Sequence, residues 1–163
     1  MKQLVIIRHE KSSWDFSILN DFDRPLNNRG NMDAPAMAKR LLDKKIAIDA
    51  FISSTAKRAF TTAKYFAETY QQKEKNIVAL PQLYHAVPSI FYDVINKIDD
   101  DLNTVAIFSH NPGITNFVNE LTAIKVDDMP TCAAFAITID CKKWQDFRNA
   151  TKAFWFFDYP KNI

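Results

Sequence analysis

Three ionisable side chains follow directly after a short apolar run near the start of the chain. The run is LVII, residues 4–7, and Arg8, His9 and Glu10 come after it without a break. Four large apolar residues in succession are typical of a strand buried on both faces. A guanidinium and an imidazole at the end of such a strand could bind an anion and attack it. The pattern predicts a chemical site at this strand end.

The chain has two histidines besides His9. His110 follows the apolar run at 104–108 after one serine, and His85 lies in the loop sequence PQLYHAVP. A lone histidine is most often a hydrogen-bonded structural side chain. The strand-end positions shared by His9 and His110 make that interpretation less favoured for these two.

Arg58 lies in the first turn of a predicted helix that follows another predicted strand. A basic side chain opposes the helix dipole there, whereas the same position suits a bound anion. The alternative is a solvent-facing arginine paired with a carboxylate. Together with Arg8, His9 and His110, Arg58 favours a tetrahedral dianion as ligand, because guanidinium groups match phosphoryl oxygens in geometry and charge.

Strand-like and helix-like segments alternate along the whole chain, with no internal repeat and no domain boundary. Strands are expected at residues 4–7, 47–52, 76–80, 104–108, 132–139 and 154–160, and helices at 33–45, 57–70, 88–98 and 113–122. This alternation predicts one α/β domain over residues 1–163, a three-layer α/β/α sandwich with a mostly parallel central sheet. Ligands bind at the carboxyl ends of strands in such sheets.

Composition narrows the class of protein. The 163 residues are 47% hydrophobic, which excludes disorder, and the net charge of +2 gives no field directed at nucleic acid. No apolar run approaches the roughly 20 residues of a membrane span, and no signal-peptide core is present, so a cytoplasmic protein is expected. Cys132 and Cys141 are expected to stay reduced. Gly30 and Gly113 alone cannot build a glycine-rich phosphate loop.

Six sequence blocks occur in a specific order over nearly the whole chain. They are RHEKSSWDF, DFDRPLNNRGNMDAPAMAKRL, DAFISSTAKRAFTTA, QLYHA, IFSHNPGITNF and MPTCAAFAI. In this ordered set the sequence resembles the histidine phosphatase superfamily, and within it the short phosphohistidine phosphatases of the SixA type. The resemblance implies a phosphoglycerate mutase-like fold and a phosphatase that needs no metal and no organic cofactor.

The resemblance also implies roles for individual residues. His9 would be the nucleophile that becomes a phosphohistidine intermediate in a ping-pong reaction. Arg8, Arg58 and His110 would bind the phosphoryl oxygens. His85 stands where members acting on sugar phosphates carry a glutamate acid, and both a proton-donor role and a structural role stay open for it.

The implied substrate is phosphohistidine on a protein, with phosphate as product and with neither nucleic acid nor membrane as partner. An imidazole leaving group asks less of a general acid than an alkoxide does. The chain also has little length for a lid, which suits a phosphorylated side chain displayed on another protein. A sugar-phosphate phosphatase, a non-catalytic phosphate-binding module and, more weakly, a zinc hydrolase are the alternatives.

Four local expectations complete the interpretation. Glu10 replaces the small residue usual in the family, and alternation along an extended chain should turn its side chain away from His9. Residues 21–25 are interpreted chiefly as a turn with internal Asp–Arg pairing, the alternative being the mouth of the pocket. Ser12 is favoured over Lys11 and Ser13 to face the phosphate. In FWFFDYP, Phe154 and Phe156 are expected on one face of the strand, and Trp155 and Phe157 on the other.

Overall fold

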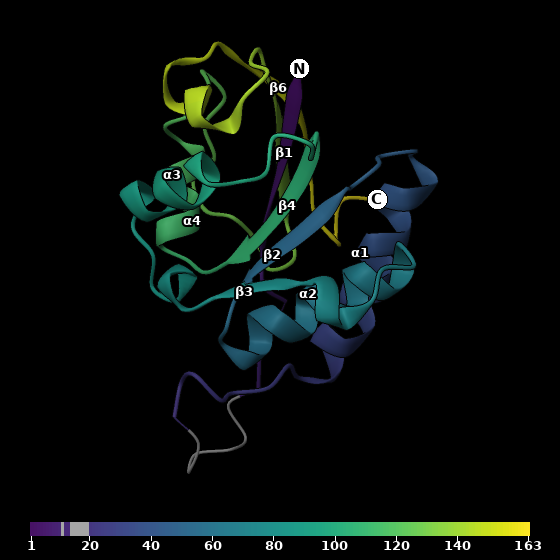
Figure 1. Ribbon diagram of the computed structural model, residues 1–163. Coiled ribbons are helices and arrows are strands. Elements are labelled where there is room, and N and C mark those ends of the chain that lie inside the picture. Colours follow the sequence, from purple (N-terminus) through teal and green to yellow (C-terminus); the bar gives the residue numbers. More distant parts are fainter. Residues whose placement is uncertain (11, 14–19) are drawn as a thin grey trace.

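One mixed sheet forms the centre of the molecule (Figure 1). The computed structural model describes residues 1–10, 12–13 and 20–163, and this part contains six strands in the order β3-β2-β4-β1-β5-β6. The strands are β1 (Lys2–Arg8), β2 (Ala50–Ser54), β3 (Val78–Leu80), β4 (Thr104–Ser109), β5 (Ala134–Ile139) and β6 (Lys152–Asp158). Four of the strands form the parallel part of the sheet: β3 pairs with β2, β2 with β4, and β4 with β1, each in parallel. β5 pairs antiparallel with β1 and with β6.

Helices cover both faces of this sheet. The α-helices are α1 (Asn28–Asp43), α2 (Lys57–Thr69), α3 (Pro88–Asn96) and α4 (Gly113–Val118), and the 3-10 helices are η1 (Glu74–Asn76), η2 (Pro81–Leu83) and η3 (Trp144–Asn149). α1 and α2 lie on one face and α3 and α4 on the other (Figure 1). The expected three-layer α/β/α sandwich with a mostly parallel sheet is confirmed. Within the described ranges no helix is long and apolar enough to cross a bilayer.

The central strands are apolar throughout because both of their faces are covered. In β1, Leu4 and Ile6 belong to the core under α3 and α4, whereas Val5 and Ile7 belong to the core under α1 and α2. All four side chains are 0% exposed. The strand therefore reaches Arg8 as a rigid element with no free face.

Helix α4 is shorter than expected and ends at Val118 instead of residue 122. The Asn119 amide explains this, because its Oδ1 accepts the Val126 N–H and its Nδ2 donates to the Val126 carbonyl, both at 2.8 Å. Two bonds from one side chain fold the following loop back on the helix end. The chain then returns to β5 along the edge of the cavity described below.

The strict alternation expected for FWFFDYP is wrong. The pairing of β6 with β5 shifts by one residue, so that Phe156 faces Ala136 while Phe154 faces Ile137, and Trp155 is the extra residue of a β-bulge. Phe154 and Phe157 consequently both contact the ring of Phe135. Trp155 and Phe156 pack together on the opposite face.

Candidate active site

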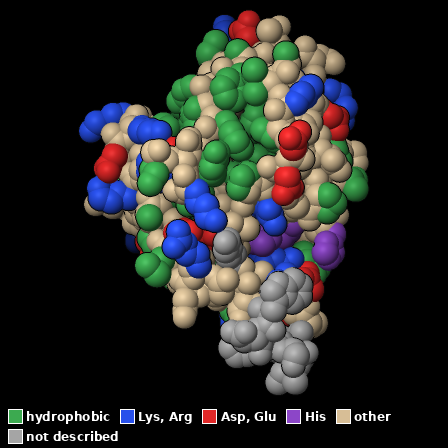
Figure 2. Space-filling model, turned by 180° about the vertical axis from the view of Figure 1, so that it is seen from behind, with side chains coloured by type: hydrophobic (Ala, Val, Ile, Leu, Met, Phe, Trp, Pro, Cys, Tyr) green, Lys and Arg blue, Asp and Glu red, His purple; other side chains and the backbone are tan. Residues whose placement is uncertain are grey.

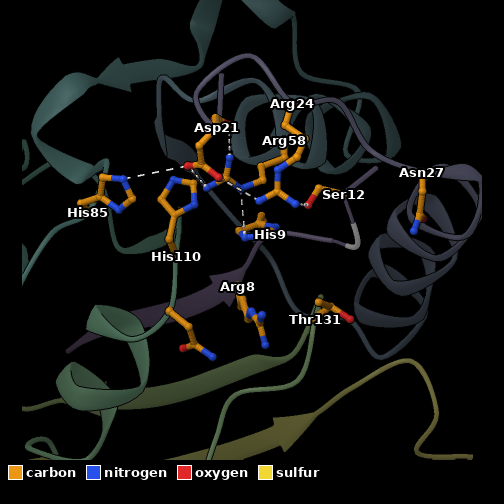
Figure 3. Close-up of a pocket in the computed structure, with 11 residues that line it drawn as sticks. Arg8, His9, Ser12, Asp21, Arg24, Asn27, Arg58, His85, His110 and Thr131 are labelled. Atoms are coloured by element: carbon orange, nitrogen blue, oxygen red, sulfur yellow. Dashed lines mark hydrogen bonds and ion pairs between the residues drawn. The ribbon is translucent and has the colours of Figure 1, made fainter. Parts of the chain in front are cut away.

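The carboxyl ends of β1, β2 and β4 meet beside one cavity of about 670 Å³ (Figure 3). The cavity is lined by Arg8, His9, Ser12, Asp21, Arg24, Asn27, Arg58, His85, His110, Asn111 and Thr131. All five residues that the sequence singled out for the site are in this set. From behind, the space-filling view shows histidines and basic side chains at the surface below a broad apolar area (Figure 2).

His9 is held as a neutral ring with a defined tautomer. Its Nδ1 lies 2.7 Å from the backbone carbonyl of Glu10, so Nδ1–H donates and Nε2 keeps its lone pair. Burial, with Arg58 and Arg8 adding their charge, lowers the pKa of His9 to about 3, although the Glu10 carbonyl acts in the opposite direction. The side chain therefore presents an unprotonated, nucleophilic nitrogen to the cavity.

Arg58 lies between the nucleophilic nitrogen and an acidic side chain. Its Nε donates to His9 Nε2 at 3.3 Å, and its Nη2 donates to Asp21 Oδ2 at 2.9 Å. The Arg58 residue is 4% exposed. The expected pairing with a carboxylate exists, but it is buried at the cavity and not solvent-facing.

Arg8 reaches the cavity from the opposite side of His9 (Figure 3). Its Nη1 donates to the Met129 carbonyl at 2.7 Å and lies 3.9 Å from Asp128 Oδ2. Its Nε is buried and has no hydrogen-bond partner among the described residues. Burial lowers the pKa of Arg8, and the Asp128 carboxylate opposes that shift. The guanidinium is thus anchored by the loop before β5 and keeps a donor for a ligand.

His110 is arranged as a neutral hydrogen-bond donor. Its Nε2 lies 2.8 Å from Ser54 Oγ, which already accepts the Ala56 N–H at 3.2 Å. When the Ser54 hydroxyl donates its proton to Nε2, the ring proton lies on Nδ1, and this is the tautomer in which His110 donates to a ligand. Nδ1 is buried and has no partner in the described part of the chain. Burial, followed by the nearby His9 and Arg58, lowers the pKa of His110 to about 2.

His85 lies at the cavity mouth and does not contact His9. Its side chain is 65% exposed, and its Nε2 is 3.9 Å from Asp21 Oδ2. The ring packs against Tyr84 with centroids 3.9 Å apart and the ring planes tilted by 36°, and it lies 6.5 Å from the His110 ring. A backbone φ of 57° turns this residue toward the opening. The structure thus places His85 at the mouth of the cavity, beside Asp21.

Asp21 is the main residue of the site that sequence reasoning did not single out. Oδ2 accepts from Tyr84 Oη at 2.6 Å and from Arg58, and Oδ1 accepts from Arg24 Nη2 at 2.9 Å. Burial alone would raise the pKa of this carboxyl, but hydrogen bonds from Tyr84 and Arg58 outweigh it and hold the pKa well below its usual range. The expected Asp–Arg pair in residues 21–25 is present, and its two members, Asp21 and Arg24, also line the cavity.

The side chains of Glu10, Ser12 and Ser13, in the loop after β1, can be placed relative to the cavity. Ser12 lines the cavity and accepts a hydrogen bond from Arg24, whereas Ser13 does not line it. Lys11 lies outside the described residues. Glu10 is 0% exposed and does not line the cavity, so its side chain points away from His9 as expected.

The chemistry available to this site is the binding and transfer of a tetrahedral anion. Two guanidinium groups and a neutral donor imidazole surround one nucleophilic nitrogen. Among residues 1–10, 12–13 and 20–163, no group of three or more His, Cys, Asp or Glu side chains is placed to hold a metal ion. An α/β domain with this strand-end arrangement defines a protein that handles phosphoryl groups.

Comparison with known proteins names the class. Residues 4–84 match the profile of the histidine phosphatase superfamily, branch 1. An uncharacterised protein of Mycobacterium tuberculosis is 30% identical over 122 residues, covering 75% of this chain and 73% of the relative. The chain belongs to the histidine phosphatase superfamily, and a phosphatase activity follows from that membership.

Solved structures share the fold at low sequence identity. The protein histidine phosphatase SixA complexed with tungstate has a TM-score of 0.83 at 22% identity, with 98% of each chain covered. A mycobacterial glucosyl-3-phosphoglycerate phosphatase has a TM-score of 0.75 at 13% identity, with 96% of this chain and 98% of the other covered. At these identities the likeness establishes the phosphoglycerate mutase-like fold and leaves the substrate to be argued from the site.

Proposed function

We propose that this protein is a metal-independent phosphohistidine phosphatase that acts through a phosphohistidine intermediate on His9. The observation that carries the proposal is the neutral His9 ring, whose Nδ1–H is committed to the Glu10 carbonyl while Nε2 faces Arg58. Without a ligand this lone pair accepts from Arg58 Nε at 3.3 Å. A phosphoryl group bound by Arg58 would displace that contact and lie in line with Nε2 for attack. Arg8, Arg58 and His110 hold the three equatorial oxygens.

The reaction has two half-reactions. In the first, the Nε2 lone pair of His9 forms a bond to phosphorus, the bond from phosphorus to the leaving group breaks, and that electron pair leaves with the substrate. In the second, water attacks phosphorus, the bond to Nε2 breaks, and its electron pair returns to the ring. Phosphate is released and one proton passes to solvent. Charge on the transferred oxygens is stabilised by Arg8 and Arg58 throughout.

Two observations favour a phosphohistidine on a protein as substrate. No described carboxylic acid at the mouth is poised to protonate an alkoxide, since Asp21 is held ionised. An imidazole leaves without that help more readily than an alcohol does. The site also opens on a face that carries a broad apolar area (Figure 2), and such areas mark contacts with other proteins. SixA shares this fold. The free thiols of Cys132 and Cys141 fit the proposed cytoplasmic setting.

A small-metabolite phosphatase is the second candidate. The cavity of about 670 Å³ is large enough for a sugar phosphate, and Asn27, Asn111 and Thr131 give its wall hydrogen-bonding groups. The fold is shared with a phosphatase named for glucosyl-3-phosphoglycerate.

A substrate screen separates these functions. We expect turnover of a phosphohistidine-containing protein to exceed that of every sugar phosphate in kcat/KM, and to persist in a chelator. His9→Ala should abolish turnover and covalent labelling by a phosphoryl donor, because no other described side chain presents an equivalent nitrogen. Labelling that persists in His9→Ala would remove His9 as the nucleophile. A sugar phosphate turned over faster than the phosphoprotein would favour the second candidate.

A further inference from the structure

We propose that Asp21 is a specificity-determining residue whose carboxylate accepts the ring N–H of an imidazole leaving group. Asp21 would thereby favour phosphohistidine over phosphate esters of alcohols. This role rests on the proposed function, and it identifies the side chain that would recognise the leaving group of the substrate at the same site.

The position of Asp21 fits the leaving-group side of the cavity. The Arg58 guanidinium contacts His9 Nε2 with its Nε and Asp21 Oδ2 with its Nη2. A phosphoryl group attacked by Nε2 and bound by Arg58 therefore has its leaving atom directed away from His9, toward the mouth where Asp21 and His85 lie. Figure 3 shows Asp21 on the outer side of Arg58, between Arg58 and His85.

Asp21 has capacity for one more donor. A carboxylate offers about four lone-pair sites. Among the described contacts, Oδ2 accepts from Tyr84 and Arg58, and Oδ1 accepts from Arg24. The side chain is 40% exposed, so an N–H from a ligand can reach the remaining site on Oδ1. Tyr84, Arg58 and Arg24 fix the carboxylate in place before the substrate arrives.

Aromatic rings border the same space. The Tyr84 ring packs against His85 in a tilted pair, at 3.9 Å between centroids, and lies 5.5 Å from His110. Phe22 contacts Tyr84 edge-on at 5.2 Å. A planar imidazole finds ring faces to pack against beside Asp21. Shape and charge favour the same leaving group.

The chemistry balances without an added proton donor. A phosphohistidine ring with the phosphoryl group on one nitrogen and a proton on the other carries a positive charge, and Asp21 accepts that N–H. When the bond from phosphorus to nitrogen breaks, the electron pair stays on the ring. The ring departs as neutral imidazole with its proton in place. The Glu10 carbonyl accepts the Nδ1–H of His9 in the same way. Each of the two imidazoles that exchange the phosphoryl group therefore donates its ring N–H to an oxygen acceptor of the protein.

An ester gains nothing from this carboxylate. An alkoxide carries no N–H and needs a proton, which an ionised Asp21 does not hold. The carboxylate instead repels the phosphoryl dianion and competes with it for Arg58 and Arg24. Asp21 thus raises the rate for one substrate class and weakens anion binding in general.

The test compares Asp21→Asn with wild type on N-phosphorylimidazole and on p-nitrophenyl phosphate, whose leaving group is a stable anion. We expect kcat/KM for N-phosphorylimidazole to fall about ten- to a hundredfold, the range of a lost hydrogen bond between charged groups. For p-nitrophenyl phosphate it should stay level or rise, and inorganic phosphate should inhibit the variant at lower concentration. Asp23→Asn, the same change in the same loop but outside the cavity, should behave as wild type.

Each other outcome decides against the role. An equal loss on both substrates would mean that Asp21 only positions Arg58 and the loop, and no loss on either would mean that it contacts no leaving group. Asp21→Ser gives the same comparison if the Asn variant is unstable. Failure of the proposed function would show separately, in the wild-type protein. That protein would then turn over a sugar phosphate but neither N-phosphorylimidazole nor a phosphohistidine protein.

Discussion

Glu10 supports His9 through its backbone, while its carboxyl is kept out of the cavity. Its carbonyl accepts from His9 Nδ1, and its N–H donates to Thr62 Oγ1, whose hydroxyl in turn donates to the Arg58 carbonyl. One residue therefore joins His9, the proposed nucleophile, to α2, which carries Arg58. The fully buried carboxyl lies beside Cys132, where burial, and then the charge of Glu10, raises the pKa of the thiol. A dianion in the cavity does not face this carboxylate.

His85 is the residue whose role depends on the leaving group. It lies at the mouth, 3.9 Å from Asp21 Oδ2, and it can donate a proton to an alkoxide that emerges there. We expect His85→Gln to lower kcat for an alkyl phosphate about tenfold or more, the low end of general-acid effects, and to change kcat for an aryl phosphate far less. Steady-state rates on the two esters measure this difference. An equal small effect on both would assign His85 a structural role.

At the scale of elements, the start of α4 carries the loop that holds His85. Gly113 is the first residue of α4, and a Cβ at this position would come within 1.7 Å of the Ala86 carbonyl oxygen. Ala86 follows His85 directly and precedes α3. Close approach of α4 to this backbone therefore sets where His85 sits relative to His110, and only glycine allows it.

Gly113→Ala tests this packing. The added methyl group must push the backbone at Ala86 away, because the nearest atom is a carbonyl oxygen and not a flexible side chain. We expect a loss of roughly 1–3 kcal/mol in the free energy of unfolding, as for other overpacked sites. Urea denaturation measures the loss, with the exposed Asn116→Ala in the same helix as control. An unchanged midpoint for Gly113→Ala would show that the loop yields freely.

At the scale of the whole molecule, the three-layer sandwich buries two imidazoles that must stay neutral. The pKa of His9 is lowered to about 3 and that of His110 to about 2, in both cases chiefly by burial. An unfolded chain holds both near 6.5. As pH falls below about 6.5, the unfolded state binds protons that the folded state does not take up, so stability is lost as pH decreases.

The predicted dependence of the unfolding free energy on pH is measurable between pH 7 and pH 5, above the range in which most carboxylates titrate. Each histidine contributes at most about 1.4 kcal/mol per pH unit to the loss of unfolding free energy. Urea denaturation at several pH values should show a shallower slope for His110→Asn than for wild type. Equal slopes in wild type and His110→Asn would contradict the buried neutral state.

Much of the fold follows from local patterns. Continuous apolar runs identified β1 and β4, and the helical spacing of apolar residues identified α1 and α3. A strand buried on both faces and a helix buried on one face leave different patterns in the sequence. The bounds differ by a few residues, as for β2, which runs from Ala50 to Ser54. The antiparallel pairing of β5 and β6 and the bulge at Trp155 were not foreseen, since nothing in a single strand reveals its partner or register.

The sequence by itself determined the cluster of His9, Arg8, Arg58 and His110, because each stands next to a recognisable strand or helix end and such ends share one edge of a parallel sheet. Only the tertiary structure decided which nitrogen of each imidazole is free and what surrounds the leaving group. Asp21 meets Tyr84 across 63 residues and His110 meets Ser54 across 56. Contacts of that separation depend on how loops close over the sheet, which leaves no periodic signal in the chain.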